Sequence, residues 1–233
     1  MMNDKDLATV QAYIQSNLDW HYDQDLRIEA SCDFRKFYDA IRALDGGYRE
    51  EINPAFDYRY NRLDWSNALW LQAIDNNGHV VGQVAAKMVA PEPSLYDAYV
   101  SERFWFANRK PESRLGIEMV SDVTRKITGR ITTGGCVWVH ETRRKTGLSG
   151  QITVLARALM IKEHRSDFHT GAIKQRLFDK NMLATYRQRH SDLSLKLRLH
   201  GYAMHTIWSS QRESLDLFRR ELAMMPVGAD QNV

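Results

Sequence analysis

The segment from Cys136 to Gly150 constrains the fold of this chain more than any other. It reads Cys-Val-Trp-Val-His-Glu-Thr-Arg-Arg-Lys-Thr-Gly-Leu-Ser-Gly, a short β-branched strand followed by a basic turn that contains glycine. Apolar residues at helical spacing follow directly: Leu148, Ile152, Leu155 and Leu159. The first turn of such a helix has free N–H groups, and the helix dipole adds partial positive charge there. The segment therefore predicts a cradle that binds phosphate groups.

The charges around this cradle have the sign that a phosphate ligand requires. Arg143, Arg144 and Lys145 lie in the turn, while Gly147 and Gly150 allow a close backbone approach. Residues 140–200 hold 13 Lys and Arg against 5 Asp and Glu. A polyphosphate ligand and an RNA backbone both suit such a region, and an ordinary solvated surface is the third alternative.

Composition narrows the class of protein. The 233 residues, 43% hydrophobic and 26% charged, predict one globular domain with a substantial core. A net charge of +3 argues against a dedicated nucleic-acid binder. Cys32 and Cys136 form no metal-type spacing, so we expect no metal and no disulfide. The polar N-terminus and the absence of a long apolar run indicate a cytoplasmic protein without a membrane segment.

Hydrophobic periodicity predicts the elements around the cradle. The expected strands are 68–74 and 80–86, joined as a hairpin by the turn Asp75-Asn-Asn-Gly78, then 136–139, 168–173 and 201–208. The expected helices begin near residues 7, 34, 95, 148, 181 and 215. The segment from Ile117 to Val123 suits a helix or a buried strand, and a helix is favoured.

The spacing Arg144-x-x-Gly147-x-Ser149-Gly150 resembles the acyl-CoA pyrophosphate loop of the GCN5-related N-acetyltransferases, the GNAT superfamily. Three further patterns of that superfamily occur in the same order along the chain. They are a hairpin whose second strand carries Val-Gly82, a helix start Asn181-x-x-Ala, and Gly201-Tyr202 before a closing strand. The resemblance covers roughly residues 66–90 and 130–208.

This resemblance implies an α+β fold of three layers (α/β/α), in which helices flank a mixed, mostly antiparallel sheet. The whole chain, 1–233, would form a single domain of this type. The two segments without a counterpart are an N-terminal helical extension, 1–65, and a long insertion, 91–129, before the strand that binds the cofactor. We expect these two segments to contact the acceptor.

The activity implied by the resemblance is direct transfer of an acetyl or other acyl group from acyl-CoA to an amine, without a metal. Strand residues Val137 and Val139 would pair with the pantetheine arm, which Asn181 would also contact. The pyrophosphate would be held by the N–H groups of Thr146, Gly147, Ser149 and Gly150, with Arg144 and Lys145 alongside.

The motifs indicate the catalytic residues less clearly than the residues that would bind the cofactor. Tyr186 is the first candidate for the acid that protonates the departing thiolate and Tyr202 the second, although either ring can serve as core packing alone. Glu118, one helical turn from Asp122, is the candidate base, and a solvated helix face is its alternative. The amine acceptor stays open. A non-catalytic acyl-CoA-binding module, an enzyme acting on an RNA-linked substrate such as aminoacyl-tRNA, and a homodimer also stay open.

Overall fold

The computed structural model describes residues 2–44, 52–108, 115–198 and 202–224. Its strands form one eight-stranded sheet in the order β1-β2-β3-β5-β6-β8-β7-β4. The neighbours β5 and β6 are parallel, and every other neighbouring pair is antiparallel. The strands are β1 (Leu26–Ser31), β2 (Ala68–Asp75), β3 (Val80–Met88), β4 (Ile117–Val120), β5 (Ile131–Val139), β6 (Phe168–Lys174), β7 (His190–Leu197) and β8 (Tyr202–Ser210).

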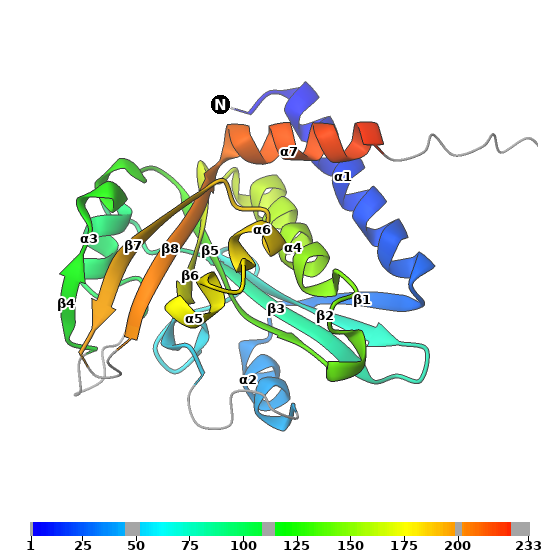
Figure 1. Cartoon of the computed structure of the whole chain (residues 1–233), viewed down its shortest axis with the longest axis horizontal. Coiled ribbons are helices and arrows are strands. Elements are labelled where there is room, and N and C mark those ends of the chain that lie inside the picture. Colours follow the sequence, from blue (N-terminus) through cyan, green and yellow to red (C-terminus); the bar gives the residue numbers. More distant parts are fainter. Residues whose placement is uncertain (1, 45–51, 109–114, 199–201, 225–233) are drawn as a thin grey trace, which may run out of the picture.

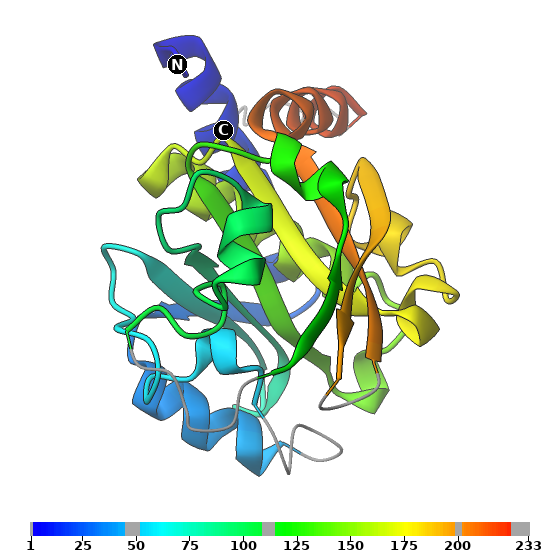
Figure 2. The same cartoon turned by 90° about the vertical axis from the view of Figure 1, so that its left-hand side faces the viewer.

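Helices cover both faces of this sheet. They are α1 (Asp4–Asp23), α2 (Phe34–Ala43), α3 (Leu95–Val100), α4 (Leu148–His164), α5 (Gln175–Phe178), α6 (Met182–Thr185) and α7 (Gln211–Met224), with the 3-10 turns η1 (Pro54–Phe56), η2 (Asp122–Lys126) and η3 (Glu141–Arg143). One face carries α4, beneath α1 and α7, and the other carries α2, η1 and α3 (Figures 1 and 2). The layered α+β fold with a mostly antiparallel sheet is confirmed.

The long helix α4 occupies the centre of its face because it is apolar on nearly every side. It packs Leu148, Ile152 and Leu155 against β2 and β3, and on its outer side Val154 and Ala158 contact the cluster of α1 and α7. A helix buried all round in this way needs helices on its outer face. No helix in the described part of the chain combines the length and apolarity needed to cross a membrane.

The N-terminal segment is helical as expected, but it also contributes a strand. Asn3 begins α1 with a capping box, in which its side chain accepts from the Asp6 N–H and the Asp6 carboxylate accepts from the Asn3 N–H. The next element, β1, pairs along its whole length with β2 and forms one edge of the sheet. The extension is therefore part of the sheet as well as a helical layer.

The hairpin of β2 and β3 confirms the expected strand pair. The Asp75 carboxylate accepts from the N–H groups of Asn77 and His79, and Gly78 adopts φ +82°. Glycine allows this backbone angle at no steric cost. The turn is therefore fixed by residues adjacent in the chain.

The helix favoured for residues 117–123 is wrong. Residues 117–120 form β4, which pairs with β7 at the other edge of the sheet, and only Asp122–Lys126 turns, as η2. The Ser121 hydroxyl accepts from the Val123 N–H and starts this turn. Four residues of amphipathic sequence suit a strand and a helical turn equally, and pairing with β7 decides between them.

The region after Asn181 also differs from the expected helix, which would carry Tyr186. The helix α6 has four residues, and Arg187, with φ +50°, turns the chain away before β7 begins. The strand β7 was not expected from the sequence. The closing strand is confirmed as β8, although Gly201 lies outside the described residues.

Candidate functional site

The strands β5 and β6 pair over only four residues and then separate. Their parallel pairing runs from Ile131 with Phe168 to Gly134 with Gly171. Beyond Gly134, β5 continues along β3, whereas β6 continues along β8. The result is a V-shaped opening in the middle of the sheet, with Gly134 and Gly171 at its apex.

A bulge in β5 lies at the start of this opening. Gln83 of β3 pairs with Trp138 of β5, and Ala85 of β3 pairs with Gly135 of β5. One residue of β3 therefore lies opposite two residues of β5, so β5 contains one extra residue. Cys136 lies in this bulge with φ +52°. Bulges bend the strand that contains them, so this one directs β5 away from β6.

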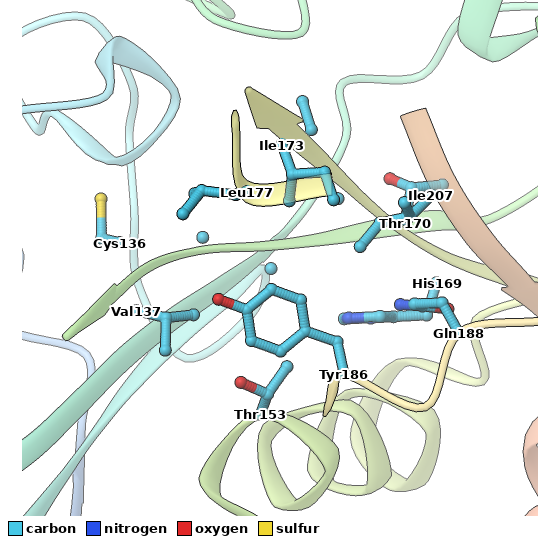
Figure 3. A pocket seen from close by; sticks show the side chains of 14 residues that line it. Cys136, Val137, Thr153, His169, Thr170, Ile173, Leu177, Tyr186, Gln188 and Ile207 are labelled. Atoms are coloured by element: carbon cyan, nitrogen blue, oxygen red, sulfur yellow. The ribbon is translucent and has the colours of Figure 1, made fainter. Parts of the chain in front are cut away.

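A pocket with about 530 Å³ of empty space, part of it open solvent, lies in the opening (Figure 3). Residues of both strands, α4 and the segment after α6 surround it. The lining residues are Gly134, Gly135, Cys136, Val137, Thr153, His169, Thr170, Gly171, Ala172, Ile173, Leu177, Tyr186, Gln188 and Ile207. None of these described lining residues is acidic.

Tyr186 extends into this pocket. Its hydroxyl is directed toward Val137 of β5, and Thr153 lies beside its ring (Figure 3). That hydroxyl has no hydrogen-bond partner among the described residues, while burial raises the Tyr186 pKa to about 12. The side chain is therefore a protonated donor that faces open space.

His169 supplies a second polar group, at the apex of the opening. Its Nδ1 lies 3.0 Å from Thr132 Oγ1, which itself donates to the Phe168 carbonyl at 3.2 Å. Because Thr132 has one hydroxyl proton, this arrangement places the imidazole proton on Nδ1 and leaves a lone pair on Nε2. Burial, with the positive charge of Arg157, holds the His169 pKa well below its ordinary value. A neutral imidazole of this kind accepts hydrogen bonds well but is a weak base.

The basic turn forms an open cradle at the N-terminus of α4. Lys145 and Gly147 have φ +67° and +89°, and, apart from its chain neighbours, no atom of the described residues lies within 4 Å of the position of a Cβ on Gly147. The backbone N–H groups of residues 145–149 have no acceptor among the described residues. Arg144 and Lys145 are exposed and, within the described part of the chain, form no ion pair. Free donors and positive charge thus face solvent together.

Gly150 lies at the inner side of the cradle and differs from expectation. Its N–H donates to the Gly147 carbonyl at 3.0 Å. A Cβ on Gly150 would lie 2.6 Å from the carbonyl oxygen of Thr185. This glycine is therefore required by the contact between α4 and α6, and its N–H is already used.

The other expected contacts with a cofactor fall around the opening. Val137 lines the pocket, and Val139 pairs with Gly82 of β3 near the cradle. Thr146 and Ser149 lie in the cradle, where the Thr146 hydroxyl donates to the Arg143 carbonyl. Asn181 is exposed with φ +59° at the start of α6 and does not line the pocket.

The remaining catalytic candidates lie elsewhere. Glu118 is on the edge strand β4, separated from β6 by β8 and β7, and not one helical turn from Asp122. It contacts Lys196 at 2.9 Å and Arg198 at 3.6 Å. The hydrogen bond from Lys196 is the main cause of its lowered pKa. Tyr202 begins β8, but its side chain lies outside the described residues.

His169, Thr153 and Gln188 were not predicted as site residues. They come from β6, α4 and the segment after α6, and no local pattern connects them. The paired glycines Gly134 and Gly171, each in the middle of a strand, were the one available signal, because strand glycines often mark a close approach. Within the described residues, no group of three His, Cys, Asp or Glu side chains could hold a metal ion.

Solved structures similar to this chain include several acetyltransferases. A structure of Arabidopsis thaliana NAA60 in complex with acetyl-CoA is 12% identical, with a TM-score of 0.48 over 79% of this chain and 98% of the other. An acetyltransferase of GNAT family from Staphylococcus aureus Mu50 is 8% identical, with a TM-score of 0.43 over 80% and 99%. An aminoglycoside N(6')-acetyltransferase from Legionella pneumophila is 7% identical, with a TM-score of 0.43 over 84% and 96%.

The chain is thus similar in fold to GNAT-type structures, as the motifs imply. No family model matches the sequence, and no curated protein matches it.

Proposed function

We propose that this chain is an N-acyltransferase of the GCN5-related N-acetyltransferase type, which transfers an acyl group from acyl-CoA to an amine. The main support for the proposal is that one strand, β5, connects the pocket with the cradle. In the middle of β5, from Gly134, the sheet opens into a pocket, and after the C-terminal end of β5 the chain enters the cradle before α4. An acyl-CoA has the matching layout, with a polyphosphate at one end of a long arm and a thioester at the other.

The cradle fits the pyrophosphate of such a ligand. Free N–H groups at residues 145–149 supply donors, and the N-terminus of the 17-residue helix α4 supplies partial positive charge. Arg144 and Lys145 add full charges. In this proposal the donors are those of Lys145, Thr146, Gly147 and Ser149, and Gly150 acts through helix packing instead.

The opening fits the arm and the thioester. On the side of β6, the backbone of residues 135–139 has no strand partner. Amide groups of a pantetheine arm can complete that edge, as an added strand would. The arm would extend along Val137 toward the apex, where the His169 lone pair can accept a hydrogen bond from the ligand.

Acyl transfer then requires one bond to form and one to break. The neutral amine attacks the thioester carbonyl and the C–N bond forms. The C–S bond breaks, the nitrogen releases one proton to solvent, and the thiolate must gain a proton. Tyr186 is our proposed donor of that proton, because its hydroxyl faces the pocket and is protonated. Glu118 is not proposed as the base, because two cations lower its affinity for a proton and it lies on the edge strand β4, away from the pocket.

One observation favours a second candidate function. No acidic residue is among the described residues that line the pocket, and the neutral His169 is a weak base. A protein of this fold that binds acyl-CoA without transferring the acyl group would need no base. The second candidate is therefore a non-catalytic acyl-CoA-binding module.

Binding and turnover separate these candidates. Isothermal titration with acetyl-CoA and longer acyl-CoAs tests binding, and release of free thiol tests turnover. The amine panel contains peptides, aminoglycosides, small polyamines and aminoacyl-tRNA. Binding with amine-dependent thiol release is expected for the enzyme. Binding without release for any amine identifies the non-catalytic module, and failure of every acyl-CoA and of free CoA to bind contradicts both.

A further inference from the structure

The side chain of Arg157, in the middle of α4, is fully buried. A buried cation is costly unless its charge is compensated, and such groups are usually paired with a carboxylate. No hydrogen bond from Arg157 to a carboxylate is present among the described residues, and its Nε has no partner there. Burial lowers its pKa to about 10, which still leaves it charged at neutral pH.

The Arg157 guanidinium donates instead to two consecutive backbone carbonyls. One terminal nitrogen donates to the carbonyl of Tyr186, and the other donates to that of Arg187 at 3.2 Å. These carbonyls belong to the irregular segment between α6 and β7, where Arg187 has φ +50°. Two bonds to adjacent peptide groups fix the orientation of both. The direction in which the Tyr186 ring leaves the backbone is fixed as well.

A second set of contacts holds the same segment from its other side. The Arg187 side chain contacts Glu221 of α7 at 3.1 Å, Gln151 of α4 at 3.2 Å and the Tyr13 hydroxyl of α1 at 3.3 Å. The Tyr13 hydroxyl in turn donates to Glu221 at 2.6 Å. Arg157 thus acts on the backbone at Tyr186, while Arg187 ties the next residue to the terminal helices.

We propose that Arg157 is a positioning residue, which holds Tyr186 in the orientation needed to protonate the leaving group. It lies outside the set of residues that line the pocket, so it acts through Tyr186 and not on the substrate. This inference rests on the proposed function for its kinetic consequence. Its structural part, the dependence of the Tyr186 orientation on Arg157, does not.

A double-mutant cycle tests the kinetic part. Arg157→Met keeps the length of the side chain but removes its donors, and we expect kcat to fall about 10- to 100-fold with the KM for acetyl-CoA within about threefold of wild type. Tyr186→Phe with Arg157→Met should be no slower than Tyr186→Phe alone, because one residue acts through the other. Losses that multiply in the double variant, or wild-type kcat in Arg157→Met, would overturn the inference.

The titration of Tyr186 tests the structural part without any activity. In protein containing ¹³C-labelled tyrosine, the Tyr186 signal is identified by its loss in Tyr186→Phe. Its pKa, about 12 in the wild type through burial, should move toward 10 in Arg157→Met as the ring becomes exposed. An unchanged pKa in the folded variant would contradict the inference. If acyl transfer itself is not found, this measurement still decides whether Arg157 positions Tyr186.

Two further variants complete the experiment. Arg157→Lys keeps the charge but cannot donate to both carbonyls from fixed positions, so its kcat and Tyr186 pKa should lie between those of the wild type and Arg157→Met. If Arg157→Met does not fold, the kcat and the Tyr186 pKa of Arg157→Lys test the inference in its place. Wild-type values of both would then overturn the inference. Arg165→Met, at the end of the same helix, is the matched control and should match the wild type.

Discussion

Lys87 and Asn61 form a hydrogen bond in the interior of the protein, with Lys87 Nζ 3.2 Å from Asn61 Oδ1. Lys87 is 1% exposed and, in the described part of the chain, has no carboxylate partner. Asn61 is otherwise satisfied by backbone groups of Pro54, Trp105 and Ala107. Burial lowers the Lys87 pKa to about 7, so this lysine opposes folding whenever the unfolded chain would carry it charged.

Replacing Lys87 by methionine should stabilise the protein at pH 7. The pKa is about 7 in the folded state against 10.5 in the unfolded state, and each unit corresponds to about 1.4 kcal/mol. We therefore expect the free energy of unfolding to rise by several kcal/mol. Urea unfolding measures it, and Asn61 Oδ1 keeps the Ala107 N–H as a partner.

The pH dependence gives the sign of this effect. Between pH 7 and 10.5 the unfolded state binds more protons than the folded state, so wild-type stability gains with rising pH from this group. Below pH 7 both states are protonated and the contribution is constant. The advantage of Lys87→Met should thus shrink toward pH 10, while Lys126→Met, at an exposed site, should show no such trend. An advantage that stays constant with pH would contradict the assigned pKa.

A carboxylate in the cradle should abolish the binding of acyl-CoA. Gly147→Glu places a negative charge beside the free N–H groups of α4, where the pyrophosphate is proposed to bind. We expect the Kd for acetyl-CoA to rise at least 100-fold in isothermal titration. Gly78→Glu is a matched control, because Gly78 has φ +82° and open space like Gly147 but lies in the β2–β3 turn. Equal affinity of the two variants would remove the cradle from the proposed site.

Adding a methyl group at Gly150 should destabilise the protein. Alanine there would place its Cβ 2.6 Å from the Thr185 carbonyl oxygen, so α4 and α6 must move apart. Overpacking of this kind costs about 1–3 kcal/mol, and urea unfolding measures it. Ser149→Ala, one residue earlier, should leave the free energy of unfolding nearly unchanged. A neutral Gly150→Ala would show that α6 adjusts freely.

Removing the hydroxyl of Tyr186 should slow acyl transfer without weakening acyl-CoA binding. General acid catalysis contributes about 10²- to 10⁴-fold, so Tyr186→Phe should lower kcat by about that factor. Because the pKa of about 12 keeps the hydroxyl protonated, this group should cause no loss of wild-type kcat as pH rises from 7 to 10. Tyr58→Phe, at the surface, is the control, and a wild-type kcat in Tyr186→Phe would exclude Tyr186 as the acid.

The sequence allowed prediction of elements whose cause lies within a few residues. The β2–β3 hairpin depends on Asp75 and Gly78, and α4 follows from its apolar periodicity and the left-handed Gly147. The strand β4 could not be separated from a helix, because the pairing of Ile117 with Leu197 bridges 80 residues. The same reason applies to β7, which also pairs with β4 across this span.

The residues of the candidate site were likewise predicted only in part. The cradle was expected from its charges and glycine, and Tyr186 was expected and does lie in the pocket, whereas its role stays a prediction. The prediction of Glu118 depends on a helical spacing to Asp122, whereas Glu118 lies on the edge strand β4. His169 was missed, because its lone pair depends on a bond with Thr132 of the neighbouring strand.

The sequence by itself determined the local framework of this protein, namely the strand, basic turn and helix around Gly147 and the hairpin at Gly78. Backbone angles, periodicity and charge act over short distances and can be recognised in the chain. Only the tertiary structure decided where the sheet opens, which groups meet in the opening and what holds them. The separation of β5 from β6, and the guanidinium of Arg157 on the backbone of Tyr186, arise from packing between segments that are distant in sequence.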